Sequence, residues 1–417
     1  MLTLIAGAIL LFLSFYARVM VKDSFHPAFV FSTVWGVGLF IISFLPLAGF
    51  FEINSNVVFL FVAGGALFSI TAIITQKTIG RYQTIPTIFS YEIIDCKKVA
   101  IFVGVLHVIV LPMAFYELLA VDNDVMRAAY LTRQYIVAKE QVFSVLTSNY
   151  MLIGQVIIPL LTIYLIKKKV KVVSYILIAF PWMAMSLLMS GRAGLIQMIF
   201  GLLFIYYIVV GRLPLRFILY IAILFLLVMV SGALTVNKVD LSLEKDFTDI
   251  VFSFLKHIAE YAFQGPILFS KYYDGKIIAS PIWSPFSSIC HMLSFVDACT
   301  PPPSLHADFN SFGYRMVGNV YSIYFSTYPN YGLSGTILVL SLYSAISTYL
   351  YNKAKTGNVF CLIISSYLFS ATVLSLSCDA FLTNLWFFIK VIILLTVLIL
   401  VCGRNKQFIM MTRKVVL

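Results

Sequence analysis

Long runs of apolar residues with almost no charge recur along this chain of 417 residues. Only 11% of the residues are charged and 61% are hydrophobic, too few polar side chains to cover a water-soluble domain of this size. In a bilayer every backbone N–H and C=O must be satisfied within the chain, which favours helices. The runs also lack the alternation of an outer-membrane barrel strand. The sequence therefore predicts an all-α polytopic integral membrane protein.

About eleven of these runs are long enough to be membrane spans. They lie at 2–17, 27–50, 57–75, 99–120, 149–166, 172–189, 193–211, 217–235, 332–351, 359–377 and 385–402. The first run has no basic segment before it, so we interpret it as a retained span and not as a cleaved signal peptide. Because no soluble domain or internal repeat is visible, we interpret 1–417 as a single membrane domain.

Basic residues divide unevenly between the loops. The odd-numbered loops and the C-terminal tail hold 18 of the 29: Arg18, Lys22, Lys77, Arg81, Lys97, Lys98, Lys167, Lys168, Lys169, Lys171, Arg212, Arg216, Lys353, Lys355, Arg404, Lys406, Arg413 and Lys414. Because Lys and Arg are enriched in cytoplasmic loops, we predict that the N-terminus lies outside and the C-terminus in the cytoplasm. The net charge of +12 thus indicates orientation, and we expect no nucleic-acid partner.

Two outer segments are longer than a connection requires. One spans 121–148 and the other 236–331, and a loop of the second length seldom serves only as a connector. Within the second, apolar residues from Phe247 to Tyr261 recur at helical spacing. This pattern predicts an amphipathic helix that lies on the outer membrane surface or packs on the bundle.

A glycine-flanked arginine stands between two apolar runs, in the sequence Ser190-Gly191-Arg192-Ala193-Gly194. A guanidinium at the edge of the hydrocarbon is costly without an anionic partner, and arginine binds carboxylates and phosphates through two parallel hydrogen bonds. We therefore consider Arg192 a candidate catalytic residue. The alternative is an arginine that anchors a tight turn by extending to the membrane surface.

Arg127 and Arg133 lie in the first outer segment. If this stretch is helical, side chains six residues apart diverge by roughly 120°, so they cannot form one clamp. One could bind an anionic ligand while the other pairs with a phospholipid headgroup. Both are candidate substrate-binding residues, and solvated surface positions are the alternative.

The second outer segment ends in a triproline, Pro301 to Pro303, followed by many polar and aromatic side chains. These include His306, Asp308, Asn310, Tyr314, Arg315, Asn319 and Tyr321. Tyrosine and asparagine suit sugars, through ring stacking and directional hydrogen bonds. His306 or Asp308 could act as a general base toward a hydroxyl. The cluster could equally be a solvated loop.

Three further predictions concern cysteine, carboxylate and metal chemistry. An oxidising compartment would permit a disulfide between Cys290 and Cys299, and the other four cysteines look unpaired. Asp379 lies in a short outer loop and is either a carboxylate in a binding cavity or the end of its helix. The five histidines lack ligand spacing, so we predict neither a metal site nor a cofactor.

Three segments resemble the bacterial oligosaccharide repeat-unit polymerases, that is, Wzy-type O-antigen polymerases. They are the HP…W opening from His26-Pro27 to Trp35, the Ser190–Gly194 turn, and Gly318-Asn319-Val320-Tyr321 followed by Tyr331-Gly332-Leu333-Ser334-Gly335. The chain departs from the family pattern at Ser322, where threonine is usual, and at Asn330-Tyr331, where an acidic-aromatic pair is common.

The resemblance implies a glycosyltransferase-C-like bundle in the bacterial inner membrane, with an active site that faces the periplasm. It implies that undecaprenyl-diphosphate-linked repeat units are polymerised there, without nucleotide sugars and with a chain-length regulator protein as a candidate partner. Arg192 is the first choice to stabilise the departing diphosphate, followed by Arg315 and then Arg127 and Arg133. His306 or Asp308 would be the base, and Asn319, Tyr321, Tyr314 and Asp379 would bind substrate.

Three alternative functions remain open. An O-antigen ligase uses the same donor and a similar outer loop. A flippase or transporter for the lipid-linked unit should carry charges within its spans, where only Lys390 and Glu117 are found. The third is a structural membrane protein without catalysis.

Overall fold

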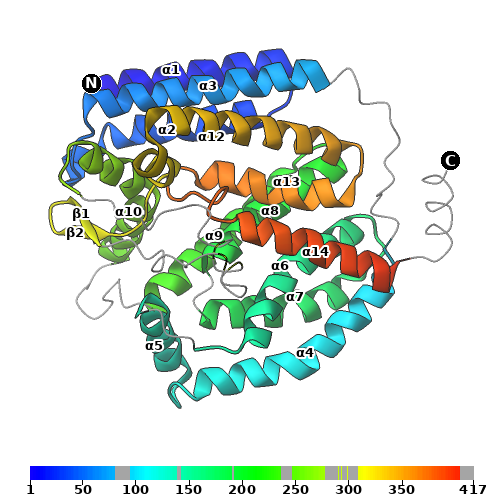
Figure 1. Cartoon of the computed structure of the whole chain (residues 1–417). Helices are drawn as coiled ribbons and strands as arrows, with labels where there is room; N and C mark the ends of the chain where they lie inside the picture. The colour runs from blue at the N-terminus through cyan, green and yellow to red at the C-terminus, as the bar shows by residue number, and fades with distance from the viewer. Residues whose placement is uncertain are drawn as a thin grey trace. The chain divides into compact units, whose positions relative to one another are not determined.

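The computed structural model describes residues 1–79, 94–138, 142–189, 192–235, 247–277 and 309–403, with single residues at 290, 293 and 298 (Figure 1). Its helices are α1 (Leu2–Val21), α2 (Pro27–Ile42), the 3-10 helix η1 (Leu45–Ala48), α3 (Ser55–Ile79), α4 (Cys96–Leu119), α5 (Val125–Ala138), α6 (Val145–Ile166), α7 (Val172–Leu188), α8 (Arg192–Val210), α9 (Leu215–Thr235), α10 (Phe247–Tyr273), α12 (Ile323–Lys355), α13 (Val359–Leu374) and α14 (Leu385–Cys402). Two short strands, β1 (Asn310–Gly313) and β2 (Met316–Gly318), complete the described elements.

Every predicted span coincides with a helix. Seven described helices are long and apolar enough to cross a membrane: α1, α3, α4, α6, α8, α12 and α14. Four shorter apolar helices, α2, α7, α9 and α13, account for the other runs. The chain is therefore a helical, multi-pass membrane protein, as its composition predicts.

Two predicted spans, 27–50 and 332–351, differ most from the observed helices. The run 27–50 breaks after Ile42, because Pro46 and Gly49 favour the short η1 over a continued α-helix. The helix α12 begins before its predicted span and contains a kink at Gly332. Its φ of 61° is readily adopted by glycine but not by residues with a side chain.

The predicted amphipathic helix is present as α10, but it runs on past Tyr261 to Tyr273. Its residues Val251 and Leu255 stay exposed, whereas the buried stretch lies further along, from Gln264 to Ser270. The apolar spacing thus predicts the helix correctly, but the face that packs is set by residues beyond that pattern.

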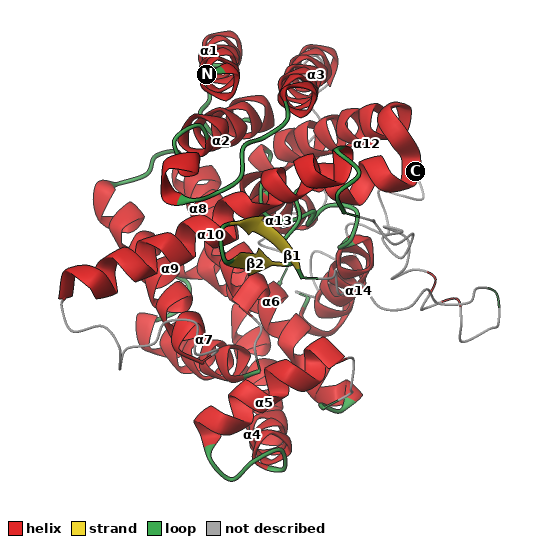
Figure 2. Ribbon diagram, turned by 90° about the vertical axis from the view of Figure 1, so that its left-hand side faces the viewer, coloured by secondary structure: helices red, strands yellow, loops and turns green. Residues whose placement is uncertain are grey.

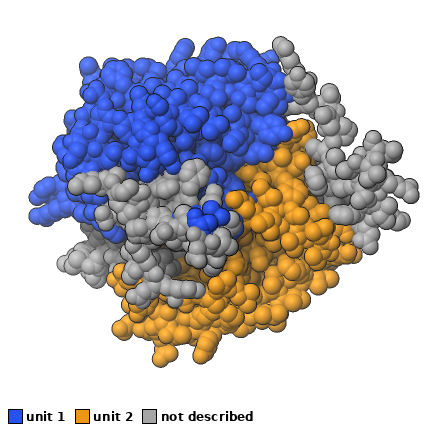
Figure 3. All heavy atoms as spheres, in the orientation of Figure 1, with its two compact units in different colours: residues 1–84, 255–352, 368–388 blue, residues 85–254, 353–367, 389–417 orange. Residues whose placement is uncertain are grey.

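The chain divides into two compact units (Figure 3). Unit 1 comprises 1–84, 255–352 and 368–388, and unit 2 comprises 85–254, 353–367 and 389–417. Each unit is assembled from segments far apart in the sequence. Four helices, α10, α12, α13 and α14, contribute residues to both units.

An aromatic core holds unit 1 together. Trp35 on α2 is fully buried, with its ring 4.9 Å from that of Phe61 on α3 and 5.0 Å from that of Tyr324 on α12. Its indole Nε1 donates to Ser375 Oγ at 2.9 Å. Close contact between α1 and α2 requires Gly7, because an added Cβ there would lie 2.8 Å from the backbone nitrogen of Phe40.

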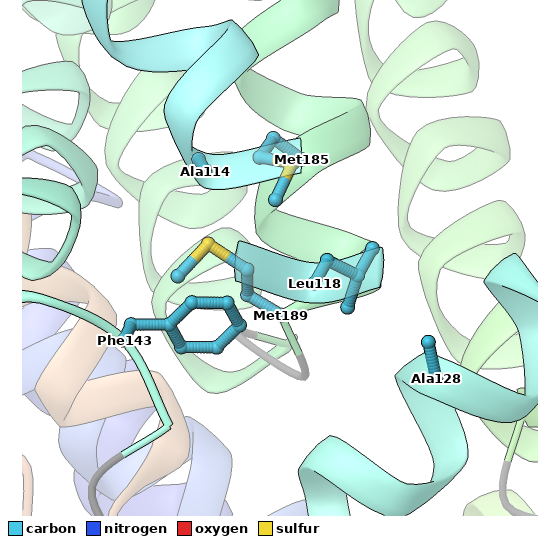
Figure 4. Packing of buried hydrophobic residues seen from close by; sticks show 6 residues of the cluster. All are labelled: Ala114, Leu118, Ala128, Phe143, Met185 and Met189. Carbon is cyan, nitrogen blue, oxygen red and sulfur yellow. The ribbon is translucent and has the colours of Figure 1, made fainter. Parts of the chain in front are cut away.

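In unit 2, the side chain of His107 on α4 contacts both α6 and α7. His107 lies 2.9 Å from the hydroxyl of Tyr150 and 2.8 Å from the carbonyl of Ile178. Trp182 packs against Gly154, where any side chain would overlap its indole. A separate apolar cluster joins α4, α5 and α7, and Figure 4 shows its six buried residues: Ala114, Leu118, Ala128, Phe143, Met185 and Met189.

Candidate functional site

Residues 310–318, within the described part of the polar segment, form a β-hairpin that leads into α12 (Figure 2, strands in yellow). β1 pairs antiparallel with β2, with Asn310 opposite Gly318. The hairpin is fixed to the chain after η1, because Tyr314 N donates to Gly49 O at 2.8 Å and Phe51 N donates to Phe312 O at 3.0 Å. Residues 310–318 therefore form regular structure, with an exposed turn at Tyr314 and Arg315.

Aromatic rings pack together between the hairpin and the start of α12. The amide of Asn310 donates to the hydroxyl of Tyr321 at 2.8 Å. The ring of Tyr321 stacks on Phe325 at 4.1 Å, and Tyr272 of α10 meets Phe325 edge-on at 5.4 Å. Asn319 lies just before these rings and is half-buried. Rings, amides and hydroxyls are groups that suit sugars. Because the rings of Tyr321 and Phe325 are buried against each other, sugar contact by Asn319 and Tyr321 stays a prediction.

Two residues of α10, which sequence reasoning missed, hold this segment in place. Buried Gln264 accepts a hydrogen bond from Val320 N at 3.4 Å, and a side chain at Gly318 would overlap it. Lys271 donates to Ser311 O at 2.9 Å, with its Nζ 4.2 Å from the Phe51 ring centroid. Burial, and to a smaller degree nearby Lys276, lowers the pKa of Lys271.

Asp379 is buried and fixes the loop between α13 and α14 to α12. Its Oδ1 accepts from Phe381 N at 2.9 Å and Leu382 N at 3.0 Å, and its Oδ2 accepts from Ser326 Oγ at 2.7 Å. Ser326 directly follows Phe325, so the carboxylate binds α12 next to the aromatic cluster. These contacts give Asp379 a positioning role, and substrate contact by it stays a prediction.

Asp379→Asn is expected to make stability less dependent on pH. Burial raises the pKa of Asp379, although hydrogen bonds from Ser326, Phe381, Leu382 and Thr383 partly oppose this. The folded chain therefore keeps this proton to higher pH than the unfolded chain, whose carboxyl has a pKa of about 3.9. The contribution of this group to the free energy of unfolding falls as pH rises through that window.

The measurement is thermal unfolding of the detergent-solubilised protein between acidic and neutral pH. Asparagine can keep the hydrogen bonds but does not titrate, so its curve should be flatter than that of the wild type. Ser326→Ala removes a contact that lowers the pKa, so its loss of stability with rising pH should extend to higher pH. Identical pH profiles for wild type and Asp379→Asn would contradict the assignment.

Tyr314 and Arg315 form the exposed turn of the hairpin. Arg315 has a φ of 55°, unusual for a residue with a side chain, and its guanidinium carbon lies 5.3 Å from the Tyr314 ring centroid. The turn is thus reached from outside the protein, while Asn319 and Tyr321 lie deeper.

The other predicted arginines belong to unit 2. Arg192 is the first residue of α8. Arg127 and Arg133 both lie on α5, so the divergence expected for a helix applies. Arg127 is exposed and pairs with Asp122 at 3.0 Å, whereas Arg133 is half-buried.

Residues His306 and Asp308 lie outside the described residues. Among those that are described, no group of His, Cys, Asp and Glu could hold a metal ion. Cys290 is disulfide-bonded, and its predicted partner Cys299 also lies outside the described part of the chain.

The HP…W segment is structural. Pro27 is the first residue of α2, and His26 caps this helix by accepting from Ala28 N at 3.3 Å. His26 and Trp35 are both fully buried. Both residues therefore contribute to the packing of α2 in unit 1.

No protein-family model, curated protein or solved structure matches the chain.

Proposed function

We propose that this chain is a Wzy-type polymerase, which joins undecaprenyl-diphosphate-linked repeat units into O-antigen or a related surface polysaccharide. The observation that carries the proposal is the cluster of aromatic and amide side chains from Asn310 to Phe325, which leads into a helix long and apolar enough to cross a membrane. Sugar-binding groups beside a bilayer suit a glycan that is attached to a lipid. The resemblance of the Ser190–Gly194 and Gly318–Tyr321 segments supports the same assignment.

The proposed reaction is a glycosyl transfer between two lipid-linked molecules. The bond between the anomeric carbon of the growing glycan and its diphosphate breaks, and undecaprenyl diphosphate leaves with the electron pair. A hydroxyl of the terminal sugar of the next unit forms the new glycosidic bond and gives its proton to a base, for which His306 and Asp308 are candidates. Arg192, or secondarily Arg315, would neutralise the charge that develops on the diphosphate.

The proposed setting is the inner membrane, with a glycosyltransferase-C-like bundle of about eleven spans and the reaction on the periplasmic face. The disulfide at Cys290 supports an oxidising compartment for this segment. Membrane lipids would surround the bundle, and a chain-length regulator remains a candidate partner.

A flippase is the alternative from another class. Its path would require charges along the spans, but among the described apolar helices the charge furthest from a helix end is Lys390, five residues into α14. Lys390 is half-buried, with its Nζ 3.5 Å from Asn149 Oδ1. The scarcity of such charges favours transfer chemistry over transport.

Deletion of the gene followed by glycan profiling separates the candidates. A polymerase mutant should retain one repeat unit on the lipid A-core and lose every longer chain. Bare core would indicate a ligase or a flippase, because without either protein no repeat unit is attached to the core.

A further inference from the structure

Exposed apolar residues occur on η1 and on the hairpin, two segments that the hydrogen bond from Tyr314 N to Gly49 O joins. Leu47 of η1 is 90% exposed, Tyr314 at the hairpin turn 71%, and Val317 on β2 55%. Met316, next to Val317, points to the opposite face and is buried. We call Leu47, Tyr314, Arg315 and Val317 the hairpin patch.

The hairpin patch lies at the end of the apolar helices of unit 1. A cavity of about 140 Å³ is lined by Leu2, Ile42 and Ser55, so the start of α1, the end of α2 and the start of α3 lie together. α1 and α3 are long and apolar enough to span, and therefore this is a level at which the chain leaves the hydrocarbon. In Figure 1 the strands lie on the same side of unit 1 as the N-terminus.

Backbone contacts fix the hairpin at this level. The hydrogen bonds of Gly49 with Tyr314 and of Phe51 with Phe312 join it to the connection between α2 and α3. The rings of Phe50 and Phe312 pack behind these bonds with centroids 5.7 Å apart. The hairpin is therefore attached at the level of the connection between α2 and α3.

The composition of the patch matches a membrane–water interface. Tyrosine and arginine are the residues that concentrate there, with apolar neighbours that reach the acyl chains. Arg315 makes no ion pair with any acid in the described part of the chain and stacks on Tyr314, so its guanidinium remains available to an anion. Anionic headgroups supply such a partner.

We propose that the hairpin patch binds the phospholipid surface, with Leu47 and Val317 at the acyl boundary and Arg315 on headgroup phosphates. The hairpin thereby holds the adjoining Asn319 and Tyr321 at headgroup depth. This inference needs only the membrane spans and does not rest on the polymerase proposal.

Fluorescence quenching tests the depth of the patch. Val317→Cys is labelled with a nitrobenzoxadiazole probe in the full-length chain, reconstituted in an equal mixture of phosphatidylcholine and phosphatidylglycerol. Cys361→Ser and Cys378→Ser first remove the two half-buried free thiols. The control is Asn123→Cys, an exposed position between Asp122 and Asp124, whose charges disfavour an anionic surface.

We expect lipids with a doxyl group near the headgroup to quench the Val317 probe but not the Asn123 probe. Aqueous iodide should give the reverse order. Equal quenching of both probes by iodide, with none by doxyl lipid, would overturn the proposal, because the patch would then face water or a soluble partner.

A second comparison tests Arg315. Doxyl-labelled phosphatidylglycerol should quench the Val317 probe more strongly than doxyl-labelled phosphatidylcholine, with a preference of up to about five-fold for one arginine. Arg315→Gln should remove this preference and leave the depth unchanged. The same preference in Arg315→Gln would overturn the headgroup contact.

Discussion

Arg192→Ala is expected to abolish polymerisation while the protein remains in the membrane. Under the proposed mechanism its guanidinium neutralises charge on the departing diphosphate, and loss of one such donor typically lowers the rate about 10²–10³-fold. The variant is expressed in the deletion strain, and surface glycans are separated by length. We expect a single repeat unit on the core, as in the empty-vector strain.

Two control variants separate a role of Arg192 in the reaction from a general effect of losing a positive charge. Arg212 lies just after the other end of α8 and is exposed, so Arg212→Ala should retain long chains. Arg192→Lys keeps the charge without the paired hydrogen bonds, so partial activity is expected. Long chains of wild-type distribution in Arg192→Ala would remove this residue from the mechanism.

Trp35→Ala is expected to lower the stability of the protein more than Trp35→Phe or Ser375→Ala. The side chain is fully buried between Phe61 and Tyr324 and donates to Ser375. Removing a buried tryptophan from a packed core typically costs about 3–5 kcal/mol, because a cavity remains. Thermal unfolding of the detergent-solubilised protein measures the loss.

Ser375→Ala removes the acceptor of the indole N–H, together with the hydrogen bond that Ser375 Oγ donates to Thr372 O, and should cost about 1–2 kcal/mol. Trp35→Phe keeps most of the ring volume and should fall between the two variants. A Trp35→Ala midpoint no lower than that of Ser375→Ala would contradict the role of Trp35 in packing. Its buried position would then need a functional reason.

The helices were predictable because each apolar run carries its own signal. Hydrophobic length alone locates α14 at 385–402, with the bounds that the structure has. Failures occur where local backbone chemistry competes with hydropathy, as at Pro46 after α2 and at Gly332 within α12. Both residues were visible in the sequence, but the extent of the break depends on neighbouring helices.

The candidate site was only partly predictable. The sequence indicates that Asn319 and Tyr321 belong to a polar, aromatic segment. The hairpin before them has two very short strands whose sequences do not alternate between apolar and polar residues. Gln264 and Lys271 were missed because their contacts with Val320 and Ser311 join residues about forty or more positions apart. A single sequence contains no signal for such pairings.

The glycan profile of the deletion strain tests the polymerase proposal most directly. We expect core molecules that carry one repeat unit, with long chains restored by the wild-type gene. Long chains that persist without this chain, or core molecules without any repeat unit, would contradict the proposal.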